Sequence, residues 1–306
     1  MQELPRIGVA GWSYPNWEGL VYPKVRRGSA HALEHLSEYV DAVEINSSFY
    51  RPIKPEYARL WAKVVEPNPR FLFSAKLHQS FTHRREIEAG AAAEFRDGLR
   101  PLQAAGRLGA LLMQFPSSFR FTSENRGFLI ELRRAFHEFP LVAELRHASW
   151  LAQEAQGTLI DYKIGFCNID QPAHTAAMPP TALLTSGVGY VRLHGRLAAN
   201  SPADLDVDRH DYLYSGDELA QWRLRIEKFR QFAGRTMVIF NNDAKAKSVV
   251  NGLQMQSIYD PSRLLAPEPL RQAYRQALAG FRGNGRMRPW AAATAQQPAL
   301  PLFQAA

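Results

Sequence analysis

The sequence predicts an α/β protein built as a single (β/α)8 barrel of the TIM type, followed by a short flexible C-terminal tail. Eight short apolar segments alternate with longer amphipathic segments over about 250 residues, the usual length of such a barrel. The apolar segments are bounded by Gly, Pro or Asn, as buried parallel strands are. A doubly wound sheet is the competing fold, but GVAGWS (8–13) is not the GxGxxG turn that such a sheet would favour.

The eight expected strands are RIGVAGWS (6–13), DAVEINS (41–47), FLFSAKL (71–77), GALLMQF (109–115), LVAELRH (141–147), IGFCNID (164–170), GYVRLHG (189–195) and TMVIFNND (236–243). Helices are expected over 29–40, 55–66, 88–105, 123–137 and 215–234. Ser29 is a candidate N-cap of the first helix, and Pro55 lies in the first turn of the second. The segment 171–188 is rich in Pro, Ala and Thr, which predicts a poor helix and makes the sixth unit the weakest.

Composition bounds the class of protein. Hydrophobic residues make up 46% and charged residues 22% of the chain, which excludes wholesale disorder, collagen and coiled coil. We expect a barrel domain over 1–282 and a low-complexity tail over 283–306. No apolar run reaches the ~18 residues that span a bilayer, and the N-terminus lacks the pattern of a signal peptide. No membrane association is therefore expected.

Charge and cysteine content indicate the setting. The single cysteine, Cys167, excludes an internal disulfide and a cysteine-based zinc site, and indicates a reducing, cytoplasmic location. Lys and Arg number 37 against 29 Asp and Glu, a net charge of +8 that favours polyanionic partners.

Polar residues gather at the C-terminal ends of the expected strands, where barrel enzymes place their active sites. Side chains alternate along a strand, so residues two apart share a face: Glu44 with Asn46, Glu144 with Arg146, and Arg192 with His194. If these faces point inward, acids and bases from several strands meet at one mouth.

Two interpretations of these charges compete. A charge in an apolar strand is costly unless it is paired. Glu44 could pair with Lys76 on the next strand, and Glu144 with Arg146 or Arg192, merely filling the top of the barrel. The concentration of polar groups at one end favours a functional site instead.

The loops after the strand ends are basic and aromatic, which suits an anionic ligand that contains rings. Alternatively, the aromatic residues cap the barrel and the arginines are solvated. The loop residues are Trp12, Tyr14, Trp17, Tyr22, Lys24, Arg26, Arg27, Phe49, Tyr50, Arg51, Lys54, Phe81, His83, Arg84, Arg85, Phe119, Arg120, Phe121 and Trp150.

No cofactor is assigned, although a divalent metal is possible because carboxylates and histidines are ligand types. No HExxH or similar local spacing is present. The acidic stretch ADLDVDRHD (203–211) lacks the glycine and terminal Glu of an EF-hand, so we expect a solvated loop. Lys76 could form a Schiff base, but a clamp for phosphate or carboxylate suits the loop chemistry better.

Seven motifs lie at the ends of the expected strands: GWSYPNWEGLVYP, VEINSSFYRPIKPE, FSAKLHQSFTH, LLMQFPSSF, ELRHASW, YVRLHGR and FNND. They follow one another in the order of the YecE-like family, a domain-of-unknown-function family. The chain resembles this family over about residues 6–256. The resemblance implies a TIM-type barrel, and a DNA-related role has been suggested for the family by analogy with barrel endonucleases. It adds weight to Tyr50 and His83. Ala10, Leu145 and Ala148 depart from the family pattern without removing an ionisable group.

The tail contains a second resemblance. QPALPLF (297–303) resembles the short peptide that binds the bacterial sliding clamp. Pro298 departs from the usual Leu. The resemblance implies a sliding clamp as a partner, contacted through Gln297, Leu300, Leu302 and Phe303.

The leading hypothesis is an enzyme that acts on a phosphorylated or nucleic-acid substrate at the barrel mouth, with phosphoester hydrolysis as the favoured reaction. Glu44 and Glu144 are the candidate general bases, and His147 and His194 the candidate general acids. The candidate substrate-binding residues are Asn46, Tyr50, Lys76, His83, Gln114, Arg146, Trp150, Arg192, Asn242 and Asp243. The alternatives are a non-catalytic, repair-associated nucleic-acid-binding module with a clamp-binding tail, and a metal-free isomerase, lyase or glycosidase on a small anionic metabolite.

Overall fold

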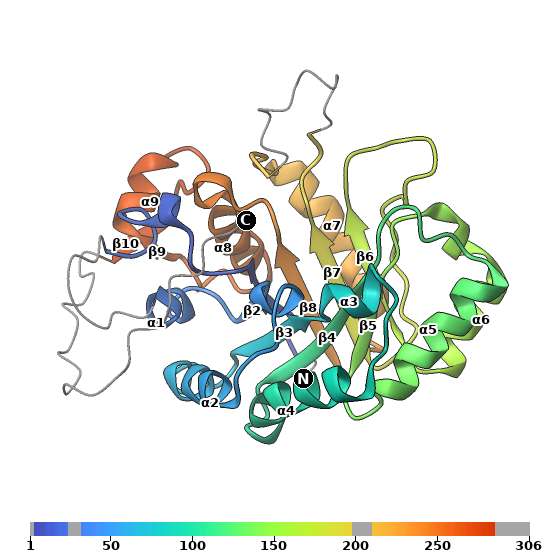
Figure 1. Cartoon of the computed structure of the whole chain (residues 1–306). Coiled ribbons are helices and arrows are strands. Elements are labelled where there is room, and N and C mark those ends of the chain that lie inside the picture. Colours follow the sequence, from blue (N-terminus) through green and yellow to red (C-terminus); the bar gives the residue numbers. More distant parts are fainter. Residues whose placement is uncertain (1–2, 24–31, 198–209, 285–306) are drawn as a thin grey trace, which may run out of the picture.

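The computed structural model describes residues 3–23, 32–197 and 210–284 (Figure 1). Within these residues, eight strands form one closed barrel in which each strand pairs in parallel with its neighbours in sequence and the eighth returns to the first. The expected fold class is confirmed. The strands are β1 (Arg6–Ala10), β2 (Ala42–Ile45), β3 (Leu72–Lys76), β4 (Leu108–Gln114), β5 (Leu141–Glu144), β6 (Gly165–Asp170), β7 (Val188–Leu193) and β8 (Arg235–Phe240).

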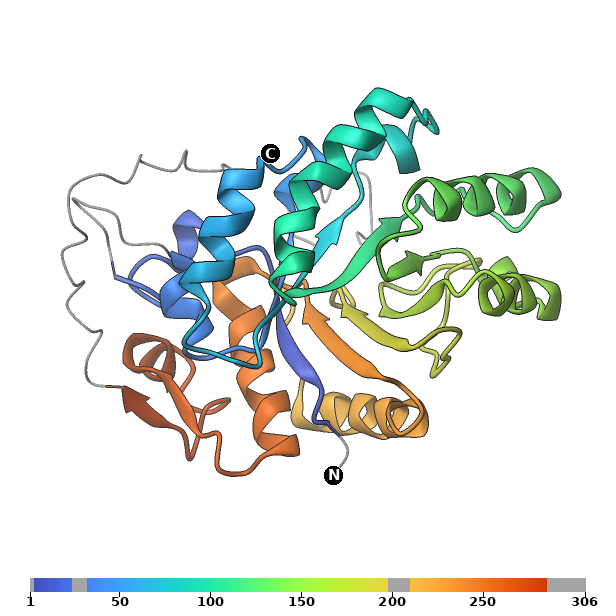
Figure 2. The same ribbon diagram turned by 90° about the horizontal axis from the view of Figure 1, so that it is seen from below.

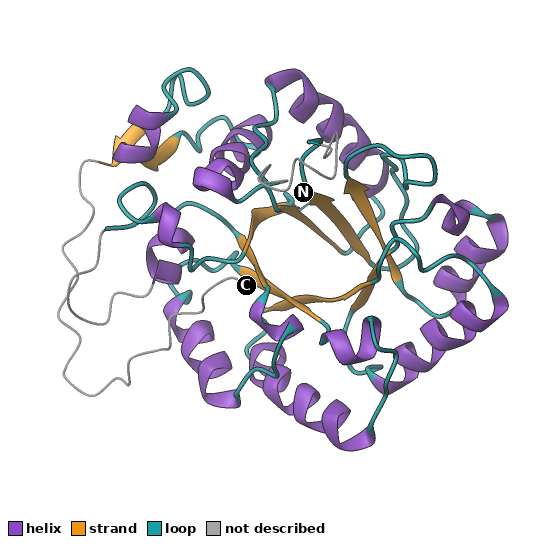
Figure 3. Cartoon of the chain, turned by 45° about the horizontal axis from the view of Figure 1, so that its top comes forward, coloured by secondary structure: helices purple, strands orange, loops and turns teal. Residues whose placement is uncertain are grey.

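Helices surround the barrel, as the views in Figures 2 and 3 show. Because both faces of the sheet are covered, nearly every strand residue is buried. The α-helices are α1 (Ala32–Ser37), α2 (Pro55–Val64), α3 (Gln79–Thr82), α4 (Ala89–Ala104), α5 (Ser123–Ala135), α6 (Gln153–Asp161), α7 (Gly216–Arg230), α8 (Lys247–Tyr259) and α9 (Glu268–Ala273). Short 3-10 helices follow four strands: η1 (Pro15–Trp17), η2 (Ser47–Phe49), η3 (Ala148–Leu151) and η4 (Ala244–Ala246).

The barrel closes through a close approach of two backbones. Gly8 of β1 lies opposite Ala42 of β2 and Ile239 of β8. A Cβ atom on Gly8 would lie 1.7 Å from the carbonyl oxygen of Ala42. Gly8 therefore permits a β1–β2 contact that any side chain would obstruct.

The observed elements follow the expected pattern with local differences. Seven of the eight strands end before the expected segment does, whereas β6 ends at Asp170 as expected. Gly11, with φ of +75°, turns the chain after β1. α7 begins with a capping box between Ser215 and Glu218. The expected N-cap Ser29 lies outside the described residues. As expected, the segment 171–187 contains no helix.

A small unit follows α8. β9 (Leu265–Pro267) and β10 (Arg282–Asn284) pair in parallel around α9, outside the ring of helices (Figure 3). Residues 283–284, expected in the tail, belong to β10, while 285–306 and the clamp-like peptide lie outside the described residues. None of the helices described could cross a membrane, since each is too short or too polar.

Candidate active site at the barrel mouth

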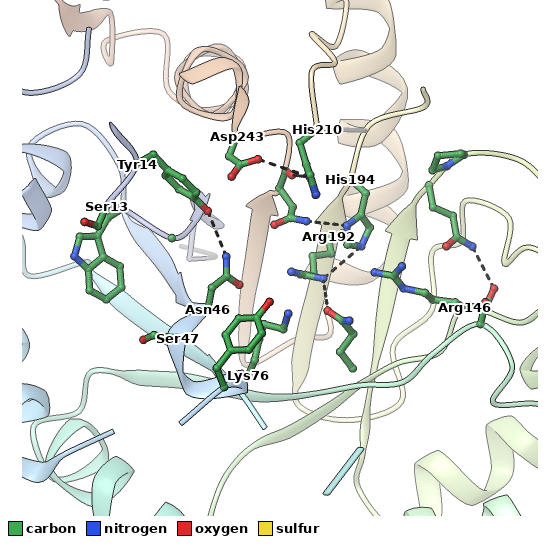
Figure 4. Close-up of a pocket in the computed structure, with 18 of the residues that line it drawn as sticks. Ser13, Tyr14, Asn46, Ser47, Lys76, Arg146, Arg192, His194, His210 and Asp243 are labelled. Carbon is green, nitrogen blue, oxygen red and sulfur yellow. Dashed lines mark hydrogen bonds and ion pairs between the residues drawn. The ribbon is translucent and has the colours of Figure 1, made fainter. Parts of the chain in front are cut away.

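A cavity of about 1030 Å³ opens at the C-terminal ends of the strands (Figure 4). Its position is where barrels of this type carry their active sites. Eight of the expected site residues line it, which are Asn46, Tyr50, Lys76, Gln114, Arg146, Arg192, His194 and Asp243. Trp12, Ser13 and Tyr14 from the loop after β1 and Gln171 and His174 from the loop after β6 complete much of the wall.

Arg192 of β7 lies at the floor of the cavity between two carboxylates. Its Nη2 donates to Oε1 of Glu44 at 2.6 Å, and its Nη1 donates to Oε2 of Glu144 at 2.7 Å. Its Nε lies 2.9 Å from Oε2 of Glu44. Arg192 is 1% exposed and both glutamates 0%. Buried charges of this kind persist only when they are paired and hydrogen-bonded.

Every oxygen of the two carboxylates accepts a hydrogen bond. The Tyr190 hydroxyl donates to Oε2 of Glu44 at 3.0 Å, and Nε of Arg146 donates to Oε1 of Glu144 at 2.7 Å. Burial alone would raise the pKa of Glu144, but Arg192 and Arg146 outweigh it and hold that pKa well below its ordinary value. Neither glutamate is among the residues that line the cavity. In this arrangement the two carboxylates anchor Arg192.

His194 is held as a neutral imidazole. Its Nε2 lies 3.2 Å from Oε1 of Glu144, and the amide nitrogen of Asn241 lies 3.0 Å from its Nδ1. These contacts fit one tautomer, in which Nε2 carries the proton and donates to Glu144 while Nδ1 accepts from Asn241. Burial lowers the pKa of His194 to about 3; Glu144 raises that pKa and Arg192 lowers it. At neutral pH, His194 therefore carries no positive charge.

We expect the protein to lose stability as the pH falls from 7 to 4. The pKa of His194 is about 3 in the folded state, against an ordinary 6.5, so below pH 6.5 the unfolded chain takes up a proton that the folded protein does not. The depressed pKa of Glu144 acts in the same direction below its ordinary value of 4.5. Thermal unfolding midpoints measured between pH 8 and pH 4 test this. His194→Gln should give a flatter curve between pH 7 and pH 5, and identical curves would contradict the assignment.

Lys76, the last residue of β3, extends into the cavity without an anionic partner. Its Nζ lies 4.4 Å from the centre of the Phe49 ring. No acceptor in the described part of the chain lies within hydrogen-bonding distance of Nζ. Burial, assisted by the charge of Arg192, lowers the pKa of Lys76 to about 8. The amine is therefore partly neutral near physiological pH.

Arg146 follows β5, and its two terminal guanidinium nitrogens are available as hydrogen-bond donors. Its Nε is committed to Glu144, and its side chain is 30% exposed. Among the described residues, nothing accepts a hydrogen bond from its two terminal nitrogens. A guanidinium of this kind presents paired donors to a carboxylate or phosphate.

The opposite wall carries a phenol, an amide, an imidazole and a carboxylate, from Tyr14, Asn46, His210 and Asp243 (Figure 4). The Tyr14 hydroxyl donates to the carbonyl oxygen of Ala10 at 2.8 Å, and the side-chain amide of Asn46 lies 3.4 Å from that hydroxyl. Burial raises the pKa of Tyr14 well above its ordinary value, and the negative charge of Asp243 raises it further, so the phenol stays protonated. His210 lies 3.7 Å from a carboxylate oxygen of Asp243. The cavity is thus cationic on one side and mixed on the other.

Comparison with known proteins places the chain in a family. A family model described as "Protein of unknown function DUF72" matches residues 6–273. The chain belongs to the DUF72 family. The YecE-like resemblance is thereby confirmed, since relatives of the DUF72 protein include the UPF0759 protein YunF of Bacillus subtilis (strain 168), 29% identical over 272 residues that cover 83% of this chain and 94% of YunF. The UPF0759 protein YecE of Escherichia coli (strain K12) is 24% identical over 261 residues, covering 81% of this chain and 90% of YecE.

Solved structures agree with the barrel of this DUF72 protein. A DUF72 family protein from Thermotoga maritima MSB8 (TM1631) is 27% identical with a TM-score of 0.71, covering 84% of this chain and 100% of that one. A DUF72 family protein from Enterococcus faecalis V583 (EF0366) is 25% identical with a TM-score of 0.73, covering 83% and 95%.

Two of the expected site residues lie behind the barrel wall of the DUF72 protein. The amide nitrogen of Asn242 donates to the carbonyl oxygen of Tyr212 at 2.7 Å and to Asn251 at 2.9 Å. Trp150 is fully buried, and its Nε1 donates to the carbonyl oxygen of Phe119 at 2.8 Å. Both support the loops around the mouth and do not line the cavity.

Two expected histidines also lie outside the cavity lining. His147 caps η3, where its Nδ1 accepts from the backbone N–H of Ser149 at 3.2 Å. His83 follows α3 and packs edge-on against Phe49, with 5.0 Å between ring centres. Burial and the nearby Lys76 lower the pKa of His83. His83 therefore reaches the site through Phe49, the ring on which Lys76 rests.

The basic loops are partly neutralised. Arg84 lies 3.4 Å from Glu86, and Arg85 lies 3.0 Å from Glu124. Three expected loop cations lie outside the described residues, namely Lys24, Arg26 and Arg27. In the ranges that the structure describes, no three His, Cys, Asp or Glu side chains are grouped so as to hold a metal ion.

Several residues of the site were not predicted from the sequence, among them Gln171 and His174 of the cavity wall, Tyr190 and His210. Tyr190 supports Glu44 from below, and its hydroxyl lies 2.7 Å from that of Ser74. Tyr190 precedes Arg192 by two positions on β7, so the side-chain alternation that places Arg192 and His194 on one face also predicts Tyr190 there. His210, within the stretch expected to be a solvated loop, lines the cavity. No local motif marks it.

Proposed function

We propose that this protein is an enzyme that acts on a small anionic substrate, phosphorylated or carboxylated, bound in the cavity at the barrel mouth. The observation that carries the proposal is the placement of Lys76 and Arg146 on the cavity wall with donors that the fold does not use. A concave site of this volume suits a small molecule. Charge-assisted hydrogen bonds from both cations would hold its anionic group.

The electrostatics favour an anion over a neutral ligand. The charges of Glu44 and Glu144 face Arg192 beneath the cavity, where all three are buried. Arg192 therefore forms the floor of the site, and the cations on the wall of the cavity are Lys76, Arg146 and, at the rim, Arg51. Low-dielectric walls strengthen their attraction for an anion relative to bulk water.

Lys76 is the residue best placed to react. Phosphoester hydrolysis, the reaction that the sequence favours, needs a group to activate water, and both glutamates are occupied with Arg192. His194 is neutral, and its Nε2–H donates a hydrogen bond to Glu144. Lys76, with a pKa of about 8, can give or take a proton near neutral pH.

A nucleic-acid substrate is the second candidate, because an exposed aromatic ring and a cation lie side by side at the rim of the cavity. Tyr50 is 54% exposed beside Arg51, and both line the cavity. An exposed ring next to a cation suits stacking of a base with its phosphate held nearby. A polynucleotide that binds with a steep salt dependence and competes with small anions would favour this candidate and its phosphoester chemistry.

Anion binding tests the proposal. We expect inorganic phosphate, pyruvate or 3-phosphoglycerate to raise the thermal unfolding midpoint of the wild type. Arg146→Ala should weaken binding by about tenfold or more by titration calorimetry, since a hydrogen bond to a charged group is worth ~1.5–3 kcal/mol. Arg120→Ala is the control, because it removes an exposed charge outside the cavity. The proposal fails if no anion binds, or if both variants bind as the wild type does.

A further inference from the structure

We propose that Lys76 forms an imine with the carbonyl carbon of a substrate that also carries a carboxylate or phosphate, such as a 2-oxo acid or a phosphorylated aldehyde. The inference rests on the proposed function, because the same cavity must bind a small anion. It adds the chemical class of that anion and the covalent role of the lysine. Two features carry it: an amine that packs on an aromatic ring without an anionic partner, and a separate group for the anion.

The first feature is the state of the amine. Nζ of Lys76 packs on the Phe49 ring and meets no carboxylate within ion-pairing distance in the described residues. Glu44 and Glu144, which could have neutralised it, are held by Arg192. A lysine that is desolvated and lies near other cations is the form in which an amine becomes a nucleophile. Its pKa of about 8 agrees with this geometry.

The second feature is that the groups that can bind an anion and a carbonyl oxygen are separate from the amine of Lys76. Arg146 lies beyond Lys76 along the barrel wall, separated by β4, and offers two free guanidinium nitrogens to an anionic group. Gln114 at the end of β4 lies between them. Its Oε1 accepts from Arg192 at 3.1 Å, which orients its amide nitrogen as a donor, and no acceptor for that nitrogen occurs in the described ranges. A substrate can therefore place its anion at Arg146 and its carbonyl oxygen at Gln114, next to Lys76.

The chemistry balances without a metal or a redox partner. The lone pair of neutral Nζ forms the C–N bond while the carbonyl π electrons move to oxygen, which gains the proton that nitrogen loses. The hydroxyl of the carbinolamine then takes up one proton from a hydronium ion and leaves as water, while the nitrogen lone pair forms the C=N bond. The product is a protonated imine, an electron sink for cleavage or proton loss at the adjacent carbon. Hydrolysis reverses these steps and restores the amine.

Reductive trapping tests the imine directly. The wild type is incubated with pyruvate, 2-oxobutyrate or glycolaldehyde phosphate in the presence of sodium borohydride, which delivers hydride to the imine carbon and leaves a stable secondary amine. We expect one adduct per chain by intact mass, mapped to Lys76 by peptide sequencing. Lys76→Met and Lys76→Arg should give none, while Lys63→Met, at an exposed lysine of α2, should label as the wild type does. Circular dichroism confirms that the variants are folded.

The pH dependence separates this lysine from surface amines. Lys76 is faced by Arg192 of β7, Glu44 of β2, Glu144 of β5 and Arg146, and His83 lies nearby across Phe49. The initial trapping rate should rise with a midpoint near pH 8, well below the ~10.4 of an ordinary lysine. A midpoint near that ordinary value overturns the assignment.

The outcomes distinguish the two proposals. No adduct at Lys76 with any probe, or labelling spread over exposed lysines, overturns the imine. If phosphate and pyruvate still stabilise the protein in an Arg146-dependent manner, the proposed anion site stands without it. An adduct at Lys76 that forms equally fast in Arg146→Ala supports the imine and overturns the assignment of Arg146 as the anion holder.

Discussion

Replacing Arg192 with Leu is expected to destabilise the protein by about 3–5 kcal/mol, the usual cost of breaking a buried ion pair. The guanidinium is the shared partner of Glu44 and Glu144, which are both fully buried. Its removal takes the shared counter-ion from both carboxylates: Glu44 keeps only the hydrogen bond from the Tyr190 hydroxyl, while Glu144 keeps Arg146. Glu44 must then take up a proton or draw in water, and either response disrupts the floor of the barrel mouth.

Urea denaturation measures this loss. Arg223→Leu is the matched control, because Arg223 lies on the exposed face of α7, and its effect should stay within about 0.5 kcal/mol. A triple variant, Arg192→Leu with Glu44→Leu and Glu144→Leu, should recover part of the stability, because no buried carboxylate is left without a partner. Arg146 loses Glu144 in this variant, but its side chain is 30% exposed and can be hydrated. Wild-type stability in Arg192→Leu would show that the three charges are not coupled.

Replacing Gly8 with Ala is expected to prevent stable folding. The added Cβ would lie 1.7 Å from the carbonyl oxygen of Ala42, 2.4 Å from its carbonyl carbon and 2.8 Å from its Cα. All three are backbone atoms of β2, so no side-chain rotation relieves the overlap. The β1–β2 contact must open, and the hydrogen bonds of a buried sheet are lost with it.

Soluble expression and thermal unfolding test this prediction. Gly157→Ala in α6 is the control, because its Cβ would meet no atom within 4 Å. At that helical position alanine should stabilise by about 0.5–1 kcal/mol. The two identical substitutions should therefore have opposite effects. A Gly8→Ala protein with the wild-type unfolding midpoint would mean that β1 and β2 are further apart than described.

The barrel could be predicted from sequence because each strand carries its own signal. A run such as GALLMQF at 109–115 is apolar, short and bounded by turn residues, and the observed β4 spans Leu108–Gln114. Buried parallel strands require continuous apolar character, so the pattern identifies them. The β9–α9–β10 unit has strands of three residues, too short to show a period, and was not predicted.

The composition of the mouth was predictable, and so was the pairing of Glu144, which was expected with Arg146 or Arg192 and contacts both; the pairing of Glu44 was not. Alternation along a strand placed Arg192 and His194 on one face, and both line the cavity. The partner of Glu44 was expected on the adjacent strand, at Lys76. In the structure it is Arg192 of β7, because closure of the barrel through β8 and β1 leaves only these two strands between β7 and β2. Sequence spacing carries no information about which strands face one another across a closed barrel.

The same is true of residues behind the wall. Asn242 and Asp243 are adjacent in sequence and equally polar, but alternation sends one to the cavity and the other to Asn251. Without the exact end of β8, their directions could not be assigned. Trp150 and His147 lie in the loop after β5, where no strand period exists to orient them.

The salt bridge at the floor of the mouth also fixes an order of assembly. Glu44 and Arg192 are separated by 148 positions, and the barrel closes only when β8 pairs with β1. Contacts that join distant segments form late, because the chain must first lose the entropy of a long loop. During synthesis, Glu44 is therefore expected to stay hydrated until the seventh strand, which carries Arg192, has been made. The pocket is therefore expected to be among the last parts of the barrel to form, and a nascent chain that stalls before β7 holds Glu44 without its counter-ion, while Glu144 already has Arg146.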